Sequence, residues 1–448
     1  MKADNHELTP FENRGISRLS SGLVSRGLAE MTRLTAPHDM PDSDSDRAGA
    51  SELSDTQLAV LLRDNPSVRE QALAIWRAAP WTPVKATTVS YRDLVAILRS
   101  RPELIANRRL TVEIAESFVG GKQIDLSEFT AIDDAAAKVL GRHKGSRLCL
   151  NGLTELSAAA ASGLAANGAN ILDLCGLTSL PEHVAAALAC FKGGVLILGP
   201  PTISARVALA LAGYRGSLHL DGLRSLPESV ARALATKTSD SFWSHNLFFD
   251  GLQVLQESAA AALAQSNAKL HLNGLASLST ELASALSQHK GYVLTLDGVA
   301  ELSHAVATEL AQHSRRLTLD GLTTLDDRVA VALSTHRGES LSLAGLRTLS
   351  DAAAIALSRH SGNELWLGGI ENLSNSALQF LVAKGGVLCL DGLRVLSDPG
   401  AAIVAEHKGI ISLCGVTEIS VSAARDFTQF QGKELCLNAD VCNSSAVG

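Results

Sequence analysis

Aromatic residues are scarce in this chain of 448 residues. Phe, Trp and Tyr together make up 4% of the sequence, whereas hydrophobic residues as a whole make up 46%. A large globular core normally takes much of its volume from aromatic rings, so this core must be built mainly from Leu, Ala and Val. The length alone would suggest about three domains, but the composition argues against that division.

An excess of charge is also lacking. The sequence has 39 Lys and Arg against 46 Asp and Glu, with a net charge of −7 and an isoelectric point near 6.0. This excludes a broad basic surface as the main driver of binding, so we expect a protein partner, no nucleic acid and no membrane. No run of 18 apolar residues occurs, and the N-terminal MKADNHELTPFENRG lacks the apolar region of a signal peptide.

Common chemical motifs are missing as well. None of the seven cysteines forms a C-x-x-C pair, so we expect reduced thiols and a cytoplasmic protein, with an exported effector as the alternative. The sequence contains no G-x-S-x-G, P-loop, H-E-x-x-H or G-x-G-x-x-G motif. It therefore predicts a protein that is not an enzyme and has no catalytic residue, cofactor or metal site.

An internal repeat dominates the chain. The phrase L-x-L-x-G-L-x-x-L-S-x-x-x-A-x-x-L-A-x-H-x-G returns at intervals of 23 or 24 residues, with one interval of 29 between Gly222 and Gly251. A degenerate copy begins at Ile124 and the last copy begins at Leu435, which gives fourteen strand positions. The repeated glycines are Gly152, Gly176, Gly199, Gly222, Gly251, Gly274, Gly298, Gly321, Gly345, Gly369, Gly392 and Gly415.

Each repeat predicts a short strand, a turn and a helix. The alternation L-x-L places two leucines on one face of the strand and the residue between them on the other. The Asp-Gly or Asn-Gly that follows suits a turn in which Gly takes a positive φ. Ser303, Ser350 and Ser397 suit helix N-caps. Pro227 suits a first helical turn, and glycines such as Gly291 suit helix ends.

Stacking is what makes such a repeat stable. One unit cannot bury its own apolar face, whereas stacked units bury a continuous one. Because helices are bulkier than strands, we expect the parallel sheet to lie on the concave side of the stack. The expected fold class is therefore an α/β solenoid with a curved parallel sheet, outer helices and an N-terminal helical cap.

Segments such as LCLNGLTEL, LHLDGLRSL and LTLDGLTTL resemble the strands and turns of leucine-rich-repeat proteins. The resemblance covers about residues 124–437 and is strongest to a bacterial variety with G-L-x-x-L-S followed by an Ala-rich helix. Leu153 and Leu322 stand where the family has Asn, so its asparagine ladder is missing. We expect the polar residue before each Gly to take over part of that role. The resemblance implies a non-enzymatic protein-binding or scaffold protein.

The region before the repeats differs in composition. Residues 1–52 are polar and rich in Ser and Asp, which predicts a disordered N-terminal tail. Residues 53–120 show helical apolar patterns, which predict a helical region that caps the first repeat or forms a functional domain. Residues 121–448 form the predicted solenoid.

Two rows of polar residues follow the repeat. Six histidines share one position near the predicted helix ends, where we interpret them as cations or donors for free carbonyl groups rather than as a metal site. A row of Asp and Asn before Gly is interpreted as Asx turns that need no ion. The histidines are His143, His289, His313, His336, His360 and His407, and the second row is Asp221, Asp250, Asn273, Asp297, Asp320 and Asp391.

The residue between the two strand leucines should face out of the concave sheet. These residues are mostly small, with large or functional groups at His219, Phe248, His271 and Trp366. In order they are Asp125, Cys149, Asp173, Leu196, His219, Phe248, His271, Thr295, Thr318, Ser342, Trp366, Cys389, Ser412 and Cys436.

The long repeat interval marks the predicted binding site. Its extra residues fall in ATKTSDSFWSHNLFFDG, and insertions in solenoids are loops that often carry recognition. Trp and Phe also anchor many interfaces. Alternatively, Phe242 and Trp243 fold inward and fill a packing defect. The predicted partner-binding residues are His219, Phe242, Trp243, His245, Phe248, His271 and Trp366.

The sequence thus predicts a scaffold that binds a protein through the concave sheet and the 236–250 loop. An exported effector with its signal in residues 1–52 is one alternative. A metal-assisted hydrolase built on His219, His271, Asp221 and Asp250 is the weakest, because an outward row lacks a closed pocket. The last strand, Leu435–Leu437, precedes no helix, so we expect self-association through this edge or a tail folded over it.

Overall fold

The computed structural model describes residues 69, 72, 73, 109–238 and 245–438. All of them belong to one unit of the chain, residues 62–448. The predicted tail at 1–52 and most of the predicted cap at 53–120 lie outside the described residues, so both stay predictions. The part of the cap region that is described holds a short strand and a helix that packs on the first helix of the repeats.

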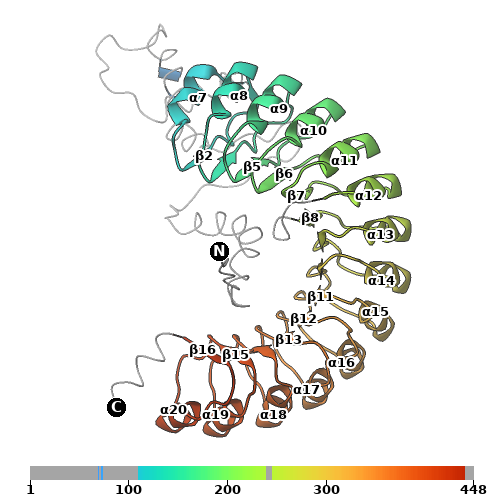
Figure 1. The fold of residues 1–448 in the computed structure, drawn as a ribbon, viewed down its shortest axis with the longest axis vertical. Coiled ribbons are helices and arrows are strands. Elements are labelled where there is room, and N and C mark those ends of the chain that lie inside the picture. Colours follow the sequence, from blue (N-terminus) through green and yellow to red (C-terminus); the bar gives the residue numbers. More distant parts are fainter. Residues whose placement is uncertain (1–68, 70–71, 74–108, 239–244, 439–448) are drawn as a thin grey trace, which may run out of the picture. The chain divides into compact units, whose positions relative to one another are not determined.

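Short strands and short helices alternate throughout the described chain (Figure 1). The strands are β1 (Arg109–Leu110), β2 (Gln123–Asp125), β3 (Ala131–Ile132), β4 (Arg147–Cys149), β5 (Ile171–Leu174), β6 (Val195–Leu198), β7 (Ser217–His219), β8 (Asn246–Phe248), β9 (Lys269–His271), β10 (Val293–Thr295), β11 (Arg316–Thr318), β12 (Ser340–Ser342), β13 (Glu364–Trp366), β14 (Val387–Cys389), β15 (Ile410–Leu413) and β16 (Glu434–Leu437).

The helices of the described chain from residue 109 onward are seven to nine residues long. They are α7 (Val112–Phe118), α8 (Asp134–Leu140), α9 (Ala158–Ala165), α10 (Glu182–Leu188), α11 (Ala205–Ala212), α12 (Glu228–Leu234), α13 (Glu257–Leu263), α14 (Thr280–Ser287), α15 (His304–Leu310), α16 (Asp327–Ser334), α17 (Asp351–Leu357), α18 (Asn375–Ala383), α19 (Asp398–Ala405) and α20 (Val421–Phe427).

The strands confirm the expected solenoid. Fourteen of them, β2 and β4 to β16, form one sheet in which each strand pairs in parallel with its neighbours in sequence. The other two, β1 and β3, pair with each other. The helices form a second layer against one face of this sheet (Figure 1). Each strand with its following helix is called a rung below.

The core lies between the two layers and consists almost wholly of Leu and Ala. The first leucines of neighbouring strands stand side by side, as Leu294, Leu317 and Leu341 do, and all three are fully buried. The helices contribute the predicted stripe, since Ala307, Leu310 and Ala311 are also fully buried. Small Ala side chains let the helices approach closely, which explains a core with few rings.

One predicted outward residue is wrong. Leu196 pairs with Leu172 of the preceding strand and is fully buried, whereas Ile197 pairs with the outward Asp173. The segment VLIL is apolar throughout, so its alternation does not show which residues face the core. If the strand register is predicted wrongly by one residue, every side chain of the strand is assigned to the opposite face.

The helix starts follow the prediction. The hydroxyl groups of Ser303, Ser350 and Ser397 each accept a hydrogen bond from the backbone N–H three residues later. Pro227 is itself the N-cap rather than a residue of the first turn. The Ser350 hydroxyl also donates to the carboxylate of Asp327 in the preceding helix, at 2.5 Å. Such bonds join the starts of neighbouring helices as well as capping them.

The turn glycines have a different role from the expected one. Among the described glycines, only Gly120, Gly385 and Gly386 have a positive φ, and none of these is a turn glycine of the repeat. A Cβ on Gly345 would instead overlap the backbone carbonyl oxygen of Asp320 in the preceding rung. Most other turn glycines face the preceding rung in the same way. The repeat requires Gly because adjacent rungs approach too closely for a side chain.

The glycines expected to end helices also serve packing. Helix α14 already ends at Ser287, so Gly291 lies in the loop beyond it. A Cβ on Gly291 would overlap the ring of His289 and the carbonyl oxygen of Ala268. Phe191 with Gly193 and Tyr214 with Gly216 repeat this arrangement. The helix-end interpretation of these glycines is therefore wrong.

We predict that Gly345→Ala destabilises the protein by at least about 2 kcal/mol, because the added methyl group forces neighbouring backbones apart. Gly213→Ala is the matched control, since its Cβ would meet only the carbonyl oxygen of Ala210, at 3.2 Å. Urea unfolding of both variants measures the difference. Equal stability of the two variants would contradict the inter-rung explanation.

The last strand of the sheet, β16, pairs on only one side within the described chain. Its residues Leu435 and Leu437 are half-buried. Unpaired strand edges tend to pair with another chain unless they are covered.

We predict that the full chain self-associates through β16 unless residues 439–448 cover it. Sedimentation velocity over a range of concentrations measures this, and Leu435→Lys should shift the protein toward the monomer. A wild-type chain that stays monomeric at high concentration, with fast amide exchange in residues 438–448, would contradict both versions.

Candidate protein-binding face

The sheet face turned away from the helices carries the candidate site, and we call it the free sheet face. Three rows of side chains cross it: the first residue of each strand, the residue between the two core positions, and the residue before the turn Gly. The middle row is in register from strand to strand, as Cys149 with Asp173 and His219 with Phe248 show. The predicted row therefore exists, apart from the replacement of Leu196 by Ile197, but most of its side chains are not exposed. Its buried members, each at most 8% exposed, are Cys149, Asp173, His219, Thr295, Thr318, Ser342, Trp366, Cys389 and Ser412.

A stack of three rings occupies the middle row on β7, β8 and β9. The ring centroids of His219 and Phe248 lie 3.8 Å apart with planes at 7°, and those of Phe248 and His271 lie 3.9 Å apart at 10°. Equal strand positions on neighbouring strands place the three rings face to face. Because their faces cover each other, only ring edges can meet a partner; His219 is 7% exposed, and Phe248 and His271 are half-buried.

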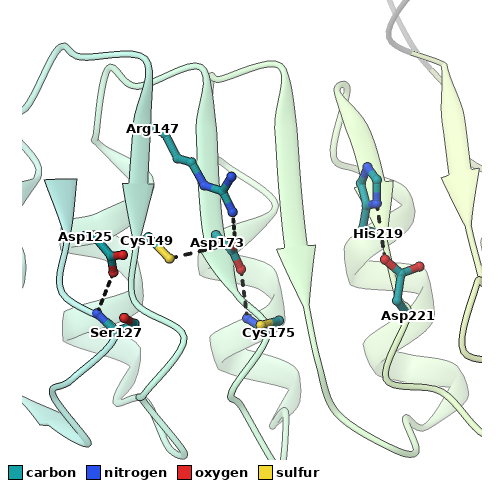
Figure 2. A network of polar contacts seen from close by, with 8 residues as sticks. All are labelled: Asp125, Ser127, Arg147, Cys149, Asp173, Cys175, His219 and Asp221. Carbon is teal, nitrogen blue, oxygen red and sulfur yellow. Dashed lines mark hydrogen bonds and ion pairs between the residues drawn. The ribbon is translucent and has the colours of Figure 1, made fainter. Parts of the chain in front are cut away.

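Polar neighbours orient the two imidazoles. His219 Nδ1 lies 3.4 Å from Asp221 Oδ2, as Figure 2 shows. His271 Nε2 lies 3.4 Å from Asn246 Oδ1, and the amide of Asn246 donates to Ser217 at 2.8 Å. Burial, together with the charges of His219 and Lys269, lowers the pKa of His271 to about 3. His271 is therefore neutral at physiological pH.

The long repeat interval leaves the sheet intact at this point. Leu218 on β7 still pairs with Leu247 on β8, so the extra residues fall before β8. His245 approaches the end of α12, where its Nε2 lies 3.0 Å from the carbonyl oxygen of Lys237. Phe249 fills a core position and is fully buried. Phe242 and Trp243 lie outside the described residues, so both alternatives for them stay open.

The row before the turn glycines forms a ladder of hydrogen bonds between rungs. The side-chain Oδ1 of Asp221, Asn273 and Asp297 each accepts a bond from the backbone N–H of the same position in the next rung, at 3.1, 3.0 and 2.9 Å. The row is therefore not a set of local Asx turns, as its sequence position suggested. It plays the part that we expected of a substitute for the asparagine ladder.

The ladder places carboxylates close to one another. Burial and the charge of Asp221 raise the pKa of Asp250 to about 6, and burial and the charge of Asp320 raise that of Asp297 to about 6. Within the described part of the chain, no Lys or Arg forms an ion pair with Asp250 or Asp297. Carboxylates thus lie beside the ring stack, where His219 pairs with Asp221 and its charge acts on Asp250. Lys269 and Arg316, the first residues of β9 and β11, add positive charge to the same face.

Trp366 occupies the middle row on β13 but is only 1% exposed. Its indole N–H donates to Glu364 Oε2 at 3.1 Å, and the guanidinium of Arg316 lies 5.4 Å from the ring centroid. Arg316 Nη1 also lies 3.9 Å from Glu364 Oε2. The ring is therefore held within a polar cluster of the sheet and is separate from the ring stack.

A second polar cluster lies on β4 and β5 (Figure 2). Arg147 donates to Asp173 Oδ2 at 2.5 Å, and this carboxylate is almost fully buried. Asp173 also accepts from the backbone N–H of Cys175 at 3.3 Å, and Cys149 Sγ lies 4.0 Å away. Burial, followed by the charge of Asp173, raises the pKa of Cys149 to about 12 and that of Cys175 to about 11. Both thiols are therefore protonated and weak nucleophiles.

The structure thus brings together His219, Phe248 and His271, and it places His245 at the adjacent loop. Sequence reasoning missed Asn246, and it placed Asp221 and Asp250 beside these histidines only in the hydrolase alternative. The described residues hold no group of three or more His, Cys, Asp or Glu arranged to bind a metal ion. No helix among them is long and apolar enough to span a membrane.

Comparison with known proteins finds similarity in structure and none in sequence families. No family model matches the chain, and neither does any curated protein. A solved structure titled as the crystal structure of the Rad7 and Elc1 complex in yeast contains a similar chain. That chain is 15% identical over 82% of this chain and 94% of its own length, with a TM-score of 0.35. A likeness of this degree does not bear on function.

We predict that Asp297→Asn stabilises the protein at pH 7 by about 1–2 kcal/mol, since it removes a carboxylate whose charge is unfavourable in the folded chain. A folded-state pKa above the ordinary value of 3.8 means that the folded chain binds the proton more tightly, so stability falls as pH rises from about 4 to about 6. Asn removes this loss and keeps the acceptor, as Asn273 does on the preceding rung. Urea unfolding at pH 5 and pH 7.5 measures it.

The reverse change is the matched control for this prediction. Asn273→Asp adds a carboxylate between Asp250 and Asp297, so it should lower stability at pH 7.5 more than at pH 5. If both variants show the pH dependence of the wild type, the carboxylates do not repel each other as the ladder geometry implies.

Proposed function

We propose that this protein is a non-enzymatic scaffold that binds another protein through the free sheet face over β7 to β11. The stack of His219, Phe248 and His271 forms the centre of the proposed contact, and the 236–250 segment is proposed to add to it on the sequence argument. The partner segment carries Lys or Arg side chains. The observation that supports this best is the ring stack next to Asp250 and Asp297, whose carboxylates form no ion pair with a Lys or Arg of the described chain.

The acidic row favours a basic partner for an energetic reason. The raised pKa values of Asp250 and Asp297 mean that their negative charges are unfavourable in the free protein. A cationic side chain that approaches them offsets both the burial and the mutual repulsion. The same field increases the rate of association with a basic segment.

The rigidity of the face favours binding without ordering costs. The rings are stacked on each other, and the ladder side chains are bonded to the next rung. Side chains that are already fixed lose little entropy in a complex. Rings near the centre of an interface also contribute much of its binding energy.

The remaining predicted binding residues enter this proposal differently. His245 belongs to the loop beside the stack, and Phe242 and Trp243 are proposed as further contacts on the sequence argument alone. Trp366 is left out of the central contact because its ring is almost fully buried.

Export as an effector, with a signal in residues 1–52, stays a second proposal on sequence grounds, as does a cytoplasmic location. The hydrolase built on His219, His271, Asp221 and Asp250 has less support. The two imidazoles are separated by the ring of Phe248, with which each is stacked. They therefore do not converge on one point where a substrate or an ion would lie.

Comparative capture tests the proposal. The full chain and the variant Phe248→Thr with His271→Thr are immobilised, and bound proteins are quantified by mass spectrometry after cross-linking. Thr is chosen because Thr295 and Thr318 occupy the same row on β10 and β11. We expect at least one protein whose recovery falls by about tenfold or more with the variant.

The control variant changes the opposite layer. Leu209→Ser with Val331→Ser alters two exposed side chains on α11 and α16, and it should retain the same protein. Binding should weaken in high salt, and also between pH 7.5 and pH 5.5 as Asp250 and Asp297 gain protons. Cross-links that fall equally in both variants, or that map to the helices, would reject the free sheet face as the binding surface.

A further inference from the structure

Four of the repeated histidines form a continuous row inside the protein. His289, His313, His336 and His360 follow the ends of α14, α15, α16 and α17 on consecutive rungs. Neighbouring ring centroids lie 5.9, 6.4 and 5.3 Å apart, with planes within 24° of each other. None of these four residues is more than 3% exposed. The row is therefore part of the interior rather than of the helix-end surface.

The row provides few hydrogen bonds for its nitrogens. His336 Nδ1 and His360 Nε2 lie 3.1 Å apart, so one ring donates and the other accepts. Both nitrogens of His289 and of His313 have no hydrogen-bond partner within the described chain, and the same holds for His336 Nε2 and His360 Nδ1. A protonated imidazole has two N–H donors, and at these positions no acceptor of the described chain meets them with good hydrogen-bond geometry. Nearby backbone groups favour the charged form, but they do not outweigh burial.

The charged groups that face the row oppose protonation. His289 faces His313 and the backbone of Ala268, and His313 faces Arg315 and the backbones of Ser287 and Arg316. Among the described residues, no carboxylate acts on either ring.

The other two rings face similar surroundings. His336 lies between His313 and His360 and meets the backbone of Arg315, and His360 faces Lys384 and the backbone of Gly338. Burial, with a smaller effect of the neighbouring charges, lowers the pKa of His289 and His336 to about 3 and that of His313 and His360 to about 4, although the backbone groups act in the opposite direction. We expected cations or donors for free carbonyl groups: the cation role is wrong for these four rings, whereas His407 does meet backbone carbonyl oxygens.

Other rungs of the same chain fill this position without a titratable imidazole. Phe191 and Tyr214 occupy it on earlier rungs, with ring centroids 6.1 Å apart and planes at 19°. Gly193 and Gly216 lie under these rings as Gly291 lies under His289. The fold therefore accepts a ring here that is not a histidine.

His407 shows the contrast. Its two ring nitrogens lie 3.0 and 3.1 Å from the carbonyl oxygens of Val382 and Gly386, so both have an acceptor. The four stacked rings differ from it in the number of acceptors they meet, although the repeat position is the same.

We propose that the four stacked histidines, each of which directly precedes one of the strands β10 to β13, make the segment from β10 to β13 acid-sensitive, so that it opens below about pH 6 while the rungs on either side stay closed. Opening exposes the rings to water, where each can take up a proton. The segment also carries Thr295, Thr318 and the acids Asp297 and Asp320 of the free sheet face. Opening at low pH thus displaces these residues of the free sheet face, whether or not the proposed partner binds there.

The direction of the effect follows from linkage. A histidine whose folded-state pKa is lowered contributes stability that is fully present above its unfolded pKa of about 6.5 and is lost as pH falls toward the folded pKa. Asp250 and Asp297 act in the opposite direction, because their raised pKa values make the folded chain take up protons between about pH 6 and pH 4. Variants that change only the histidines separate the two effects.

Amide hydrogen exchange of the full chain at pH 7.0, 6.0 and 5.0 tests the proposal, after correction for the intrinsic exchange rate. In the wild type, each histidine that gains a proton on opening should raise the opening constant of residues 293–366 about threefold from pH 7 to pH 6 and about eightfold from pH 6 to pH 5, given an unfolded pKa of about 6.5. Residues 171–219, whose rungs carry Phe191 and Tyr214, should keep their protection.

Two variants and one control make the test specific. His289→Phe copies the Phe191-Lys192-Gly193 sequence at His289-Lys290-Gly291, and it should lower the pH slope of residues 293–366 by one proton. His336→Phe with His360→Phe should lower it by two. His183→Gln changes an exposed histidine on α10 and should leave the slope unchanged.

Circular dichroism will show whether each variant folds. His289→Phe alone decides the outcome if the double variant does not fold. Equal pH slopes in the wild type and His289→Phe would overturn the proposal. So would opening that begins in residues 171–219 or spreads evenly over all rungs.

Discussion

The close contact between consecutive rungs is the constraint on which the rest of this structure depends. At the turn, the Cα of Gly in one rung faces the backbone carbonyl of the preceding rung without room for a side chain. This distance brings the polar residue before Gly within hydrogen-bonding reach of the next rung. It also lets rings at equal positions stack, both on the free sheet face and in the interior. One spacing therefore accounts for the ladder, the ring stack and the histidine row.

The repeat period was enough to predict the fold, because equal spacing fixes which residues pair. The fourteen-stranded sheet and the capping role of Ser303 follow from it. The errors share a physical origin. The sequence shows that Gly345 recurs at a fixed position, but the reason is a contact with the preceding rung rather than a property of the turn. Leu196 was misplaced because an entirely apolar strand carries no alternation.

The candidate site was predictable in its position and not in its chemistry. Equal strand positions bring His219, Phe248 and His271 together, and the 29-residue interval between Gly222 and Gly251 predicts a loop beside them. The acidity of the surface depends on how deeply Asp250 and Asp297 are buried and on which backbone groups they bond, which a linear pattern does not contain. Likewise, the sequence places His289 near a helix end, whereas only the packed loop shows that its ring is inside.

The strongest contacts between elements join consecutive helices and consecutive strands. In such an array, cooperativity is limited to nearest neighbours, so folding can start at any rung and a fault does not have to spread to the ends. The insertion before β8 illustrates this independence, since the pairing of β7 with β8 keeps its register. The stability of the protein is therefore a sum of contributions from single rungs and from the interfaces between neighbouring rungs. A break at its central rungs would leave two shorter stacks that can each persist and later rejoin.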